Sequence, residues 1–97
     1  MIRLSGKQIR HLRGLAHHHR IVVMMGNSGL TDTLKLEFDS ALSAHELVKV
    51  KLPAGQSKEK RAILQQLCRA AGAVPVQLIG RVGIAYRPAE TPRIILP

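Results

Sequence analysis

The hydrophobic pattern of this 97-residue chain switches repeatedly between the period of a helix and the period of a strand. Helical spacing of apolar residues predicts three helices, over residues 5–19, 31–45 and 58–71. Short apolar or alternating runs predict four strands, over residues 21–25, 47–52, 74–79 and 83–86. The resulting order α-β-α-β-α-β-β favours an α/β domain with helices packed on one four-stranded sheet. The closing hairpin makes that sheet mixed, and the whole chain, 1–97, is expected to be one domain.

Capping residues set the expected helix limits. Ser5, Thr31 and Ser57 are candidate N-caps, and Gly72 ends the third helix. In the second helix one face is apolar and is expected to be buried, and its members are Leu34, Phe38, Ala41, Leu42 and His45. The residue pair His45 and Glu46 follows at a helix-to-strand junction, where a structural or capping role is expected.

The strands differ in how they are expected to be buried. The run 21–25 is continuously apolar and is expected to be a buried strand. The run 47–52 alternates, so its valines and Leu52 should face the core while Lys49 and Lys51 face water or a ligand. Residues 80–83 are expected to form a hairpin turn, and residues 93–96 a short edge strand after the break at Pro88 and Pro92.

Charge is distributed very unevenly along the chain. The net charge is +9, and residues 1–31 contain five basic residues and no carboxylate. Residues 32–46 are acidic, and the remainder is again basic. In the first helix Lys7, Arg10 and Arg13 share the polar side. A helix face that carries bases without acids indicates a polyanion-binding surface, although a solvated face remains the alternative.

The turn Gly26-Asn27-Ser28-Gly29 follows the expected strand 21–25 and precedes the second helix. Glycine permits positive φ and lacks the Cβ that would hold a phosphate away from backbone N–H groups. Asn27 and Ser28 can add side-chain hydrogen bonds to a phosphate or a 2′-hydroxyl. An ordinary tight turn is the alternative, and the pattern is neither a P-loop nor a dinucleotide fingerprint.

Other chemistries find little support in the sequence. Cys68 is the single cysteine, which excludes an internal disulfide, and it is expected to be a buried thiol in the third helix. The histidines His17, His18 and His19 diverge around a helix, so no metal site is expected. No catalytic set and no cofactor site is recognised. Phe38 and Tyr86 are the only aromatic residues, which excludes an aromatic stacking platform for bases.

The sequence also bears on the cell compartment. No apolar run approaches the length of a membrane span, and the first residues lack the apolar core of a signal peptide. A cytoplasmic, monomeric protein that binds no membrane and no small-molecule substrate is expected.

Five stretches together resemble the CRM domain family (chloroplast RNA splicing and ribosome maturation) in its bacterial stand-alone, YhbY-like form. They are residues 12–17, 22–31, 44–51, 77–80 and 86–88. The resemblance implies an RNA-binding domain whose fold is similar to the C-terminal domain of translation initiation factor three. It also implies that RNA contacts the glycine turn and that the protein associates with precursors of the large ribosomal subunit. In that family a lysine usually follows the first glycine, whereas this chain has Asn27.

These observations lead to the expectation of a non-enzymatic RNA-binding protein that assists assembly of the large ribosomal subunit by binding structured rRNA. The expected RNA contacts are Lys7, Arg10, Arg13, Arg20, Gly26, Asn27, Ser28, Gly29, Lys49 and Lys51. One alternative is a protein-interaction module whose acidic second helix docks a ribosomal protein. A weaker alternative is a small hydrolase that uses His45 or Cys68.

Overall fold

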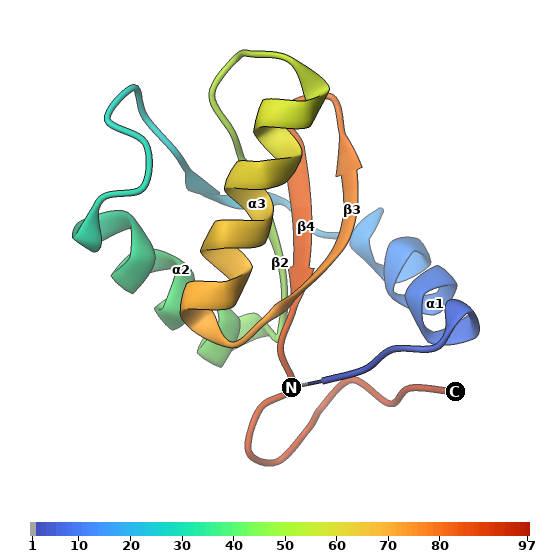
Figure 1. The fold of residues 1–97 in the computed structure, drawn as a ribbon. Helices are drawn as coiled ribbons and strands as arrows, with labels where there is room; N and C mark the ends of the chain where they lie inside the picture. Colours follow the sequence, from blue (N-terminus) through green and yellow to red (C-terminus); the bar gives the residue numbers. More distant parts are fainter. Residues whose placement is uncertain (1) are drawn as a thin grey trace.

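A computed structural model describes residues 2–97 and contains three helices and four strands among them (Figure 1). The elements are, in chain order, α1 (Gly6–Ala16), β1 (Ile21–Met24), α2 (Asp32–His45), β2 (Leu47–Lys51), α3 (Ser57–Ala71), β3 (Val74–Ile79) and β4 (Val82–Tyr86). The predicted order α-β-α-β-α-β-β is therefore confirmed. The predicted single mixed sheet is confirmed as well.

The four strands form one sheet in the order β1-β2-β4-β3. The strands β1 and β2 are parallel, whereas β4 is antiparallel to both of its neighbours, β2 and β3. The last strand in sequence therefore inserts between β2 and β3, and β1 and β3 become the two edges. The strands β1, β2 and β3 run in the same direction, so all three finish at one end of the sheet. The segments that follow them therefore lie at that end, and they are the glycine turn, the loop 53–56 and the β3–β4 hairpin (Figure 1).

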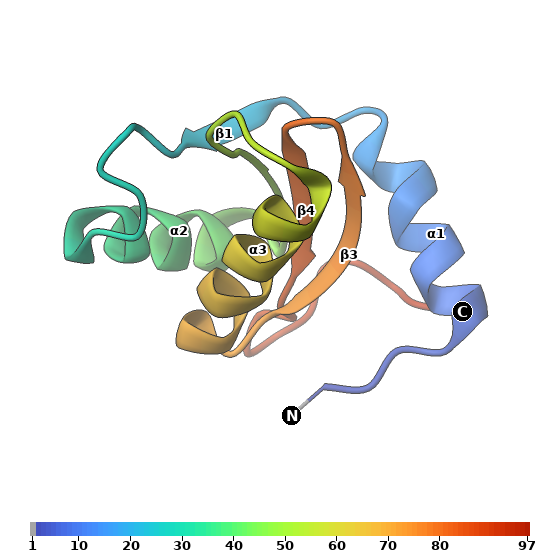
Figure 2. The same ribbon diagram turned by 45° about the horizontal axis from the view of Figure 1, so that its top comes forward.

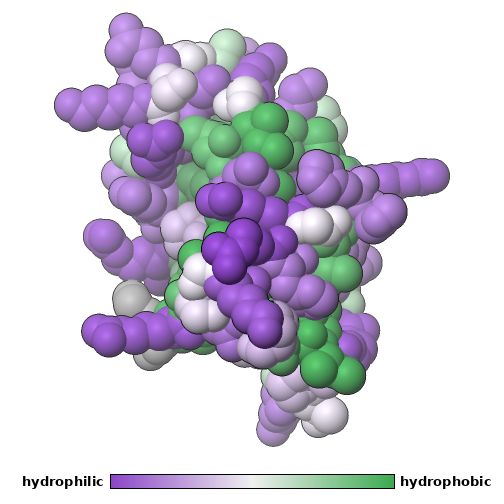
Figure 3. All heavy atoms as spheres, turned by 90° about the vertical axis from the view of Figure 1, so that its right-hand side faces the viewer, coloured by the Kyte–Doolittle hydropathy of each residue, from purple (hydrophilic) through white to green (hydrophobic). Residues whose placement is uncertain are grey.

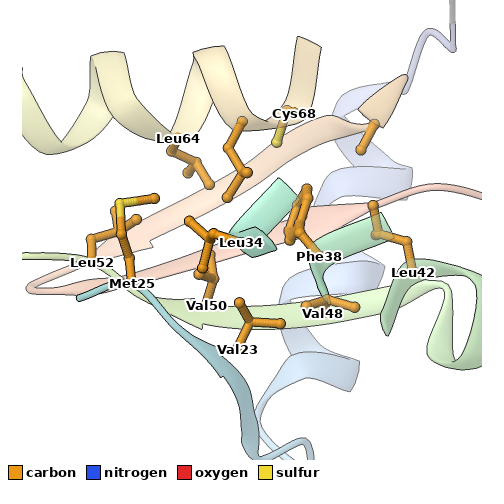
Figure 4. Packing of buried hydrophobic residues seen from close by; sticks show 13 residues of the cluster. Val23, Met25, Leu34, Phe38, Leu42, Val48, Val50, Leu52, Leu64 and Cys68 are labelled. Atoms are coloured by element: carbon orange, nitrogen blue, oxygen red, sulfur yellow. The ribbon is translucent and has the colours of Figure 1, made fainter. Parts of the chain in front are cut away.

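Both faces of the sheet are covered, but by different elements (Figures 1 and 2). On one face α2 and α3 pack against the strands, and Figure 4 shows Leu34, Phe38 and Leu42 of α2 directed toward the valines of β1 and β2. On the other face α1 lies across β2 and β3 with the C-terminal tail beside it. The buried residues of that second cluster are Leu12, Ala16, Leu47, Val76, Ile84 and Tyr86.

Two predictions at the N-terminal end are wrong. The helix α1 ends at Ala16, three residues before His19, and His17 is its C-cap. The predicted buried strand over 21–25 is an edge strand, β1, in which Val23 is buried and Met24 is 66% exposed; Met25, just after the strand, is buried. Its outward face is open because α1 packs mainly on β2 and β3, and three of the four β1 residues remain exposed. The continuous apolar run 21–25 therefore forms a strand that is buried on one face of the sheet and exposed on the other.

Several smaller limits also differ from the prediction. The cap of α3 is Gln56, whose side chain makes no capping hydrogen bond, and Ser57 is already helical. The strand β4 begins at Val82, so the hairpin turn is Gly80-Arg81, with Gly80 at a φ of 57°. The predicted stop at Gly72 is confirmed, since this residue is the left-handed C-cap of α3.

The predicted edge strand 93–96 does not form, because the segment is held by hydrogen bonds to the Glu46 side chain. The Glu46 carboxylate is fully buried and accepts hydrogen bonds from the backbone N–H groups of Ala89, Arg93 and Ile94. These donors bind a side chain instead of a neighbouring strand. His45, which was expected on the buried face of α2, is exposed. The structural role expected at this junction therefore belongs to Glu46.

Candidate nucleic-acid interface

The glycine turn is an exposed projection between β1 and α2. The N–H of Met25 donates to Lys51 O at 2.8 Å, which continues the sheet pairing to the last residue before the turn. The N–H of Gly29 then donates to Gly26 O at 3.1 Å, and Gly29 has a φ of 70°. No atom lies within 4 Å of a Cβ built at Gly26 or Gly29, so the space around the turn is open to a ligand.

The helix that follows the turn begins with a regular cap. Thr31 Oγ1 accepts the N–H of Leu34 at 3.1 Å, as the sequence predicts. Asp32 occupies the first turn of α2, where its charge is favourable for the helix but competes with an anion at the same terminus. An anion at this site is therefore expected to contact the turn itself.

The basic residues of α1 are exposed and free of internal partners. Ser5 and Gln8 form a capping box that starts the helix, and Leu12 and Ala16 bury its apolar side. Within residues 2–97 the only ion pairs join Arg87 to Asp39 and Arg93 to Glu46. Lys7, Arg10 and Arg13 consequently face solvent with their charges uncompensated, and Figure 3 shows this hydrophilic surface over α1.

The lysines of β2 lie half-buried on the sheet face that α1 partly covers. Lys49 is paired with Ile21 of β1, and Lys51 with Met24. Both partners are exposed, so this half of the sheet face presents apolar side chains beside two ammonium groups. Arg20, also exposed, leads into β1 at the same edge.

The structure does not gather all the expected contacts into one cluster. The glycine turn extends from the β1 side of the sheet, whereas α1 lies on the opposite side of the molecule in both views (Figures 1 and 2). The lysines of β2 lie on the sheet face between these regions. The candidate surface is therefore extended, and a ligand that contacts all of it must span the sheet.

Sequence reasoning missed basic residues at the end of the sheet where the turn lies. The first turns of α3 carry Lys58, Lys60 and Arg61, and the β3–β4 hairpin carries Arg81. Arg81 Nε donates to Leu52 O at 3.0 Å, which ties the hairpin to the end of β2. The basic residues of α3 form a short charged run in the sequence. Only the strand order, however, brings them to the end of the sheet where the glycine turn lies.

Two of the four carboxylates in residues 32–46 are occupied by internal contacts. Asp39 Oδ1 accepts Arg87 Nη1 at 2.6 Å, and the same guanidinium binds Ala71 O and Ser43 Oγ. Glu46 is buried under the C-terminal tail. Of the four carboxylates in residues 32–46, Asp32 and Glu37 remain without an ion-pair partner within residues 2–97.

The histidine and cysteine environments limit other chemistry. Burial lowers the pKa of His19, and the nearby charges of His45 and Lys49 lower it further, which disfavours the charged imidazolium. Burial raises the pKa of Cys68 to about 12, which keeps this thiol protonated and unreactive.

Across residues 2–97, no three His, Cys, Asp or Glu side chains are placed to hold a metal ion. Over the same range, no helix is long and apolar enough to cross a membrane.

Comparison with known proteins finds matches along nearly the whole chain. A model of the CRS1/YhbY (CRM) domain matches residues 4–87. An RNA-binding protein of Haemophilus influenzae is 43% identical over 97 residues, which cover all of this chain and 98% of that protein. YqeI of Bacillus subtilis, also named for RNA binding, is 33% identical over 97% of this chain and 99% of its own.

A solved structure is similar as well. The solution structure of SAV1595 from Staphylococcus aureus has a TM-score of 0.85 and 32% sequence identity. The match covers 98% of this chain and all of that one.

Proposed function

This chain belongs to the CRS1/YhbY (CRM) domain family, and from that premise we propose that it binds RNA without catalysing a reaction. The observation that carries the proposal is a set of exposed basic residues on α1 that have no ion-pair partner within residues 2–97. They are Lys7, Arg10 and Arg13. An exposed glycine turn with open space at both glycines supports it. The names of relatives that match 97–100% of the chain agree with it.

The geometry suggests how RNA is held. Backbone N–H groups of the turn contact a phosphate, while Asn27 and Ser28 supply side-chain hydrogen bonds to phosphate or ribose. Arg20, Lys49 and Lys51 continue the positive surface along the sheet, and α1 adds a second positive region. Since few aromatic side chains are present, affinity arises mainly from phosphate neutralisation and the release of counterions.

We further propose that the RNA is large-subunit rRNA and that the protein acts as a monomeric assembly factor in the cytoplasm. The family resemblance supports this step, because stand-alone bacterial members are associated with precursors of the large subunit. Cosedimentation with precursor particles, abolished by the double variant Arg10→Gln and Arg13→Gln, is the expected result. If the wild-type protein in an extract of growing cells stays at the top of the sedimentation gradient, apart from the precursor particles, the ribosomal role is contradicted.

The binding test is a titration of large-subunit rRNA fragments over a series of salt concentrations. The logarithm of the binding constant should fall steeply with the logarithm of salt concentration, and each neutralised arginine should lower that slope by about 0.7–0.9. A slope near zero would refute binding through phosphates.

The glycine turn is tested by Gly29→Asp, with Gly29→Asn as the matched control. Both side chains tolerate the positive φ of 70° better than most, so only the charge differs. The aspartate variant should bind RNA about tenfold more weakly than the asparagine variant, because a carboxylate repels the phosphate. Equal affinities would remove the turn from the interface.

The protein-docking alternative has one observation in its favour. Leu36 is 69% exposed on α2, in a hollow that Asp32, Lys35 and Asp39 also line. Asp39 is held by Arg87, however, so the acidic character of this face is small. A ribosomal protein that is retained on the immobilised chain after nuclease treatment, and lost on Leu36→Asp, would favour docking over RNA binding.

A further inference from the structure

A polar hollow of about 380 Å³ lies around the outer edge of β3, between α1 and α3. Its polar lining consists of Arg13 from α1, Arg61 and Gln65 from α3, and Gln77 from β3. The two helices pack on opposite faces of the sheet, so the hollow brings together side chains from both faces (Figure 1). Its volume lies at the small end of the range for ligand sites, about 300–1,000 Å³, and suits one nucleotide unit.

The lining has hydrogen-bonding capacity that the protein itself does not use. Within residues 2–97, the side chains of Arg13, Arg61, Gln65 and Gln77 make no hydrogen bond or ion pair. No carboxylate lines the hollow. Two guanidinium groups without an acid between them favour an anion, and a guanidinium can bind a phosphate through two parallel hydrogen bonds.

The strand at the centre of the hollow adds backbone groups. β3 pairs only with β4, so on its outer side the backbone N–H and C=O groups have no strand partner. Pro75 lacks an N–H and interrupts that edge, which disfavours pairing with another strand. The free backbone groups and the amides of Gln65 and Gln77 can hydrogen-bond to hydroxyl groups and base edges, which a bare inorganic phosphate does not offer.

We propose that this hollow binds a ribose–phosphate unit of an RNA strand, with Arg13 and Arg61 on the phosphate and the two glutamines on the ribose or base. The inference rests on the proposed RNA-binding function and extends the contact region of α1, through Arg13, to the outer edge of β3. β3 and β1 are opposite edges of the sheet, so the hollow and the glycine turn contact different parts of the RNA.

The direct test is a nuclear magnetic resonance titration of isotope-labelled protein with a single-stranded octanucleotide RNA. The side-chain amide signals of Gln65 and Gln77 should shift together. Gln66, which neighbours Gln65 on α3 and does not line the hollow, is the internal control and should not shift. Shifts at residues 26–29 without shifts at Gln65 and Gln77 would overturn the hollow while leaving the proposed function intact.

The energetic test compares Arg61→Gln with Arg69→Gln. Both residues are exposed arginines on α3, but only Arg61 lines the hollow. Arg61→Gln should weaken binding of the octanucleotide about tenfold and lower the salt slope by about 0.7, while Arg69→Gln changes neither. Equal effects of the two variants would show that only net charge matters and would overturn the site.

A third arm separates an RNA strand from a free nucleotide. Uridine monophosphate should produce the same shifts only at far higher concentration, because it lacks the adjoining phosphates. If it saturates the glutamine signals as readily as the octanucleotide, the hollow is a mononucleotide site and the inference is wrong. If the wild-type protein binds no RNA at any salt concentration, the proposed function itself fails.

Discussion

At the residue scale, Glu46 shows how one buried carboxylate organises a segment without secondary structure. It has a φ of 63°, a conformation that costs most non-glycine residues about 1 kcal/mol or more. Three backbone N–H groups of the tail compensate this cost by donating to its carboxylate. Burial by itself would raise the pKa of Glu46, but these donors and the charge of Arg93 outweigh burial, so the pKa is lowered.

Replacing Glu46→Gln should lower the free energy of unfolding by roughly 2–4 kcal/mol at pH 7, because the amide NH2 replaces one acceptor oxygen and places a donor against a backbone N–H donor. Because the pKa is lowered in the folded state, the ionised carboxylate stabilises the protein at pH values above its ordinary pKa of 4.5. This contribution is lost as pH falls through the folded-state value. Guanidinium unfolding at pH 7 and at about pH 3 should show a large difference between wild type and variant at pH 7 and a smaller one in acid. A difference independent of pH would contradict this role.

Asn27 is the second informative residue, since it lies in the exposed glycine turn and carries no charge. The side chain is exposed and the turn around it is open, so a longer cation fits without strain. Asn27→Lys should therefore raise RNA affinity several-fold and steepen the salt slope by about 0.7–0.9. The neutral variant Asn27→Gln is the control for side-chain length. Identical binding by both variants would show that RNA does not reach this position.

At the scale of elements, the helix α3 lies so close to β4 that any side chain at position 83 would displace Leu64. A Cβ on Gly83 would lie 2.8 Å from Leu64 Cδ1, and Leu64 is buried. By contrast, a Cβ on Gly14 in α1 would meet no atom within 4 Å. The same chemical change should therefore have opposite effects in the two elements.

Gly83→Ala should lower the free energy of unfolding by about 1–3 kcal/mol through overpacking. Gly14→Ala should raise it by about 0.5–1 kcal/mol, because alanine restricts the unfolded chain and favours helix. Thermal unfolding monitored by circular dichroism measures both. If Gly83→Ala is as stable as wild type, α3 is free to move away from the sheet.

At the scale of the whole molecule, positive charge is exposed on both sides of the sheet. Fifteen basic residues outnumber six acidic ones, and the Glu46 carboxylate is buried while its partner Arg93 keeps 61% of its side chain exposed. The surface is therefore slightly more basic than a net charge of +9 alone suggests. The glycine turn and the hollow at β3 lie at opposite edges. One strand of RNA must cross the sheet to reach both.

Because these sites share no residues, their energies should add. The double variant Gly29→Asp with Arg61→Gln should lose RNA affinity equal to the sum of the single losses within about 0.5 kcal/mol. Gly29→Asp combined with Asn27→Lys, two changes in one turn, is the control that should deviate from additivity. A deviation for the distant pair as large as that for the near pair would show that the two edges contact the same RNA group.

The sequence by itself determined the element order, the mixed sheet and the caps at Ser5, Thr31 and Gly72. These features depend on local periodicity and on hydrogen bonds between near neighbours, which residue types encode directly. It also indicated the unopposed bases of α1, since a segment without acids cannot neutralise itself. The exposure of β1 was not predictable, because burial of an apolar run depends on which helix lies over it.

Only the tertiary structure decided which distant residues meet. The strand order β1-β2-β4-β3 left β1 at one edge and β3 at the other, where Arg13 and Arg61, 48 positions apart in sequence, line the same hollow. It also placed Glu46 under residues 89–94, where its carboxylate replaces the predicted edge strand. Such contacts arise from the packing of whole elements on the two faces of a sheet, and no local pattern of residues specifies them.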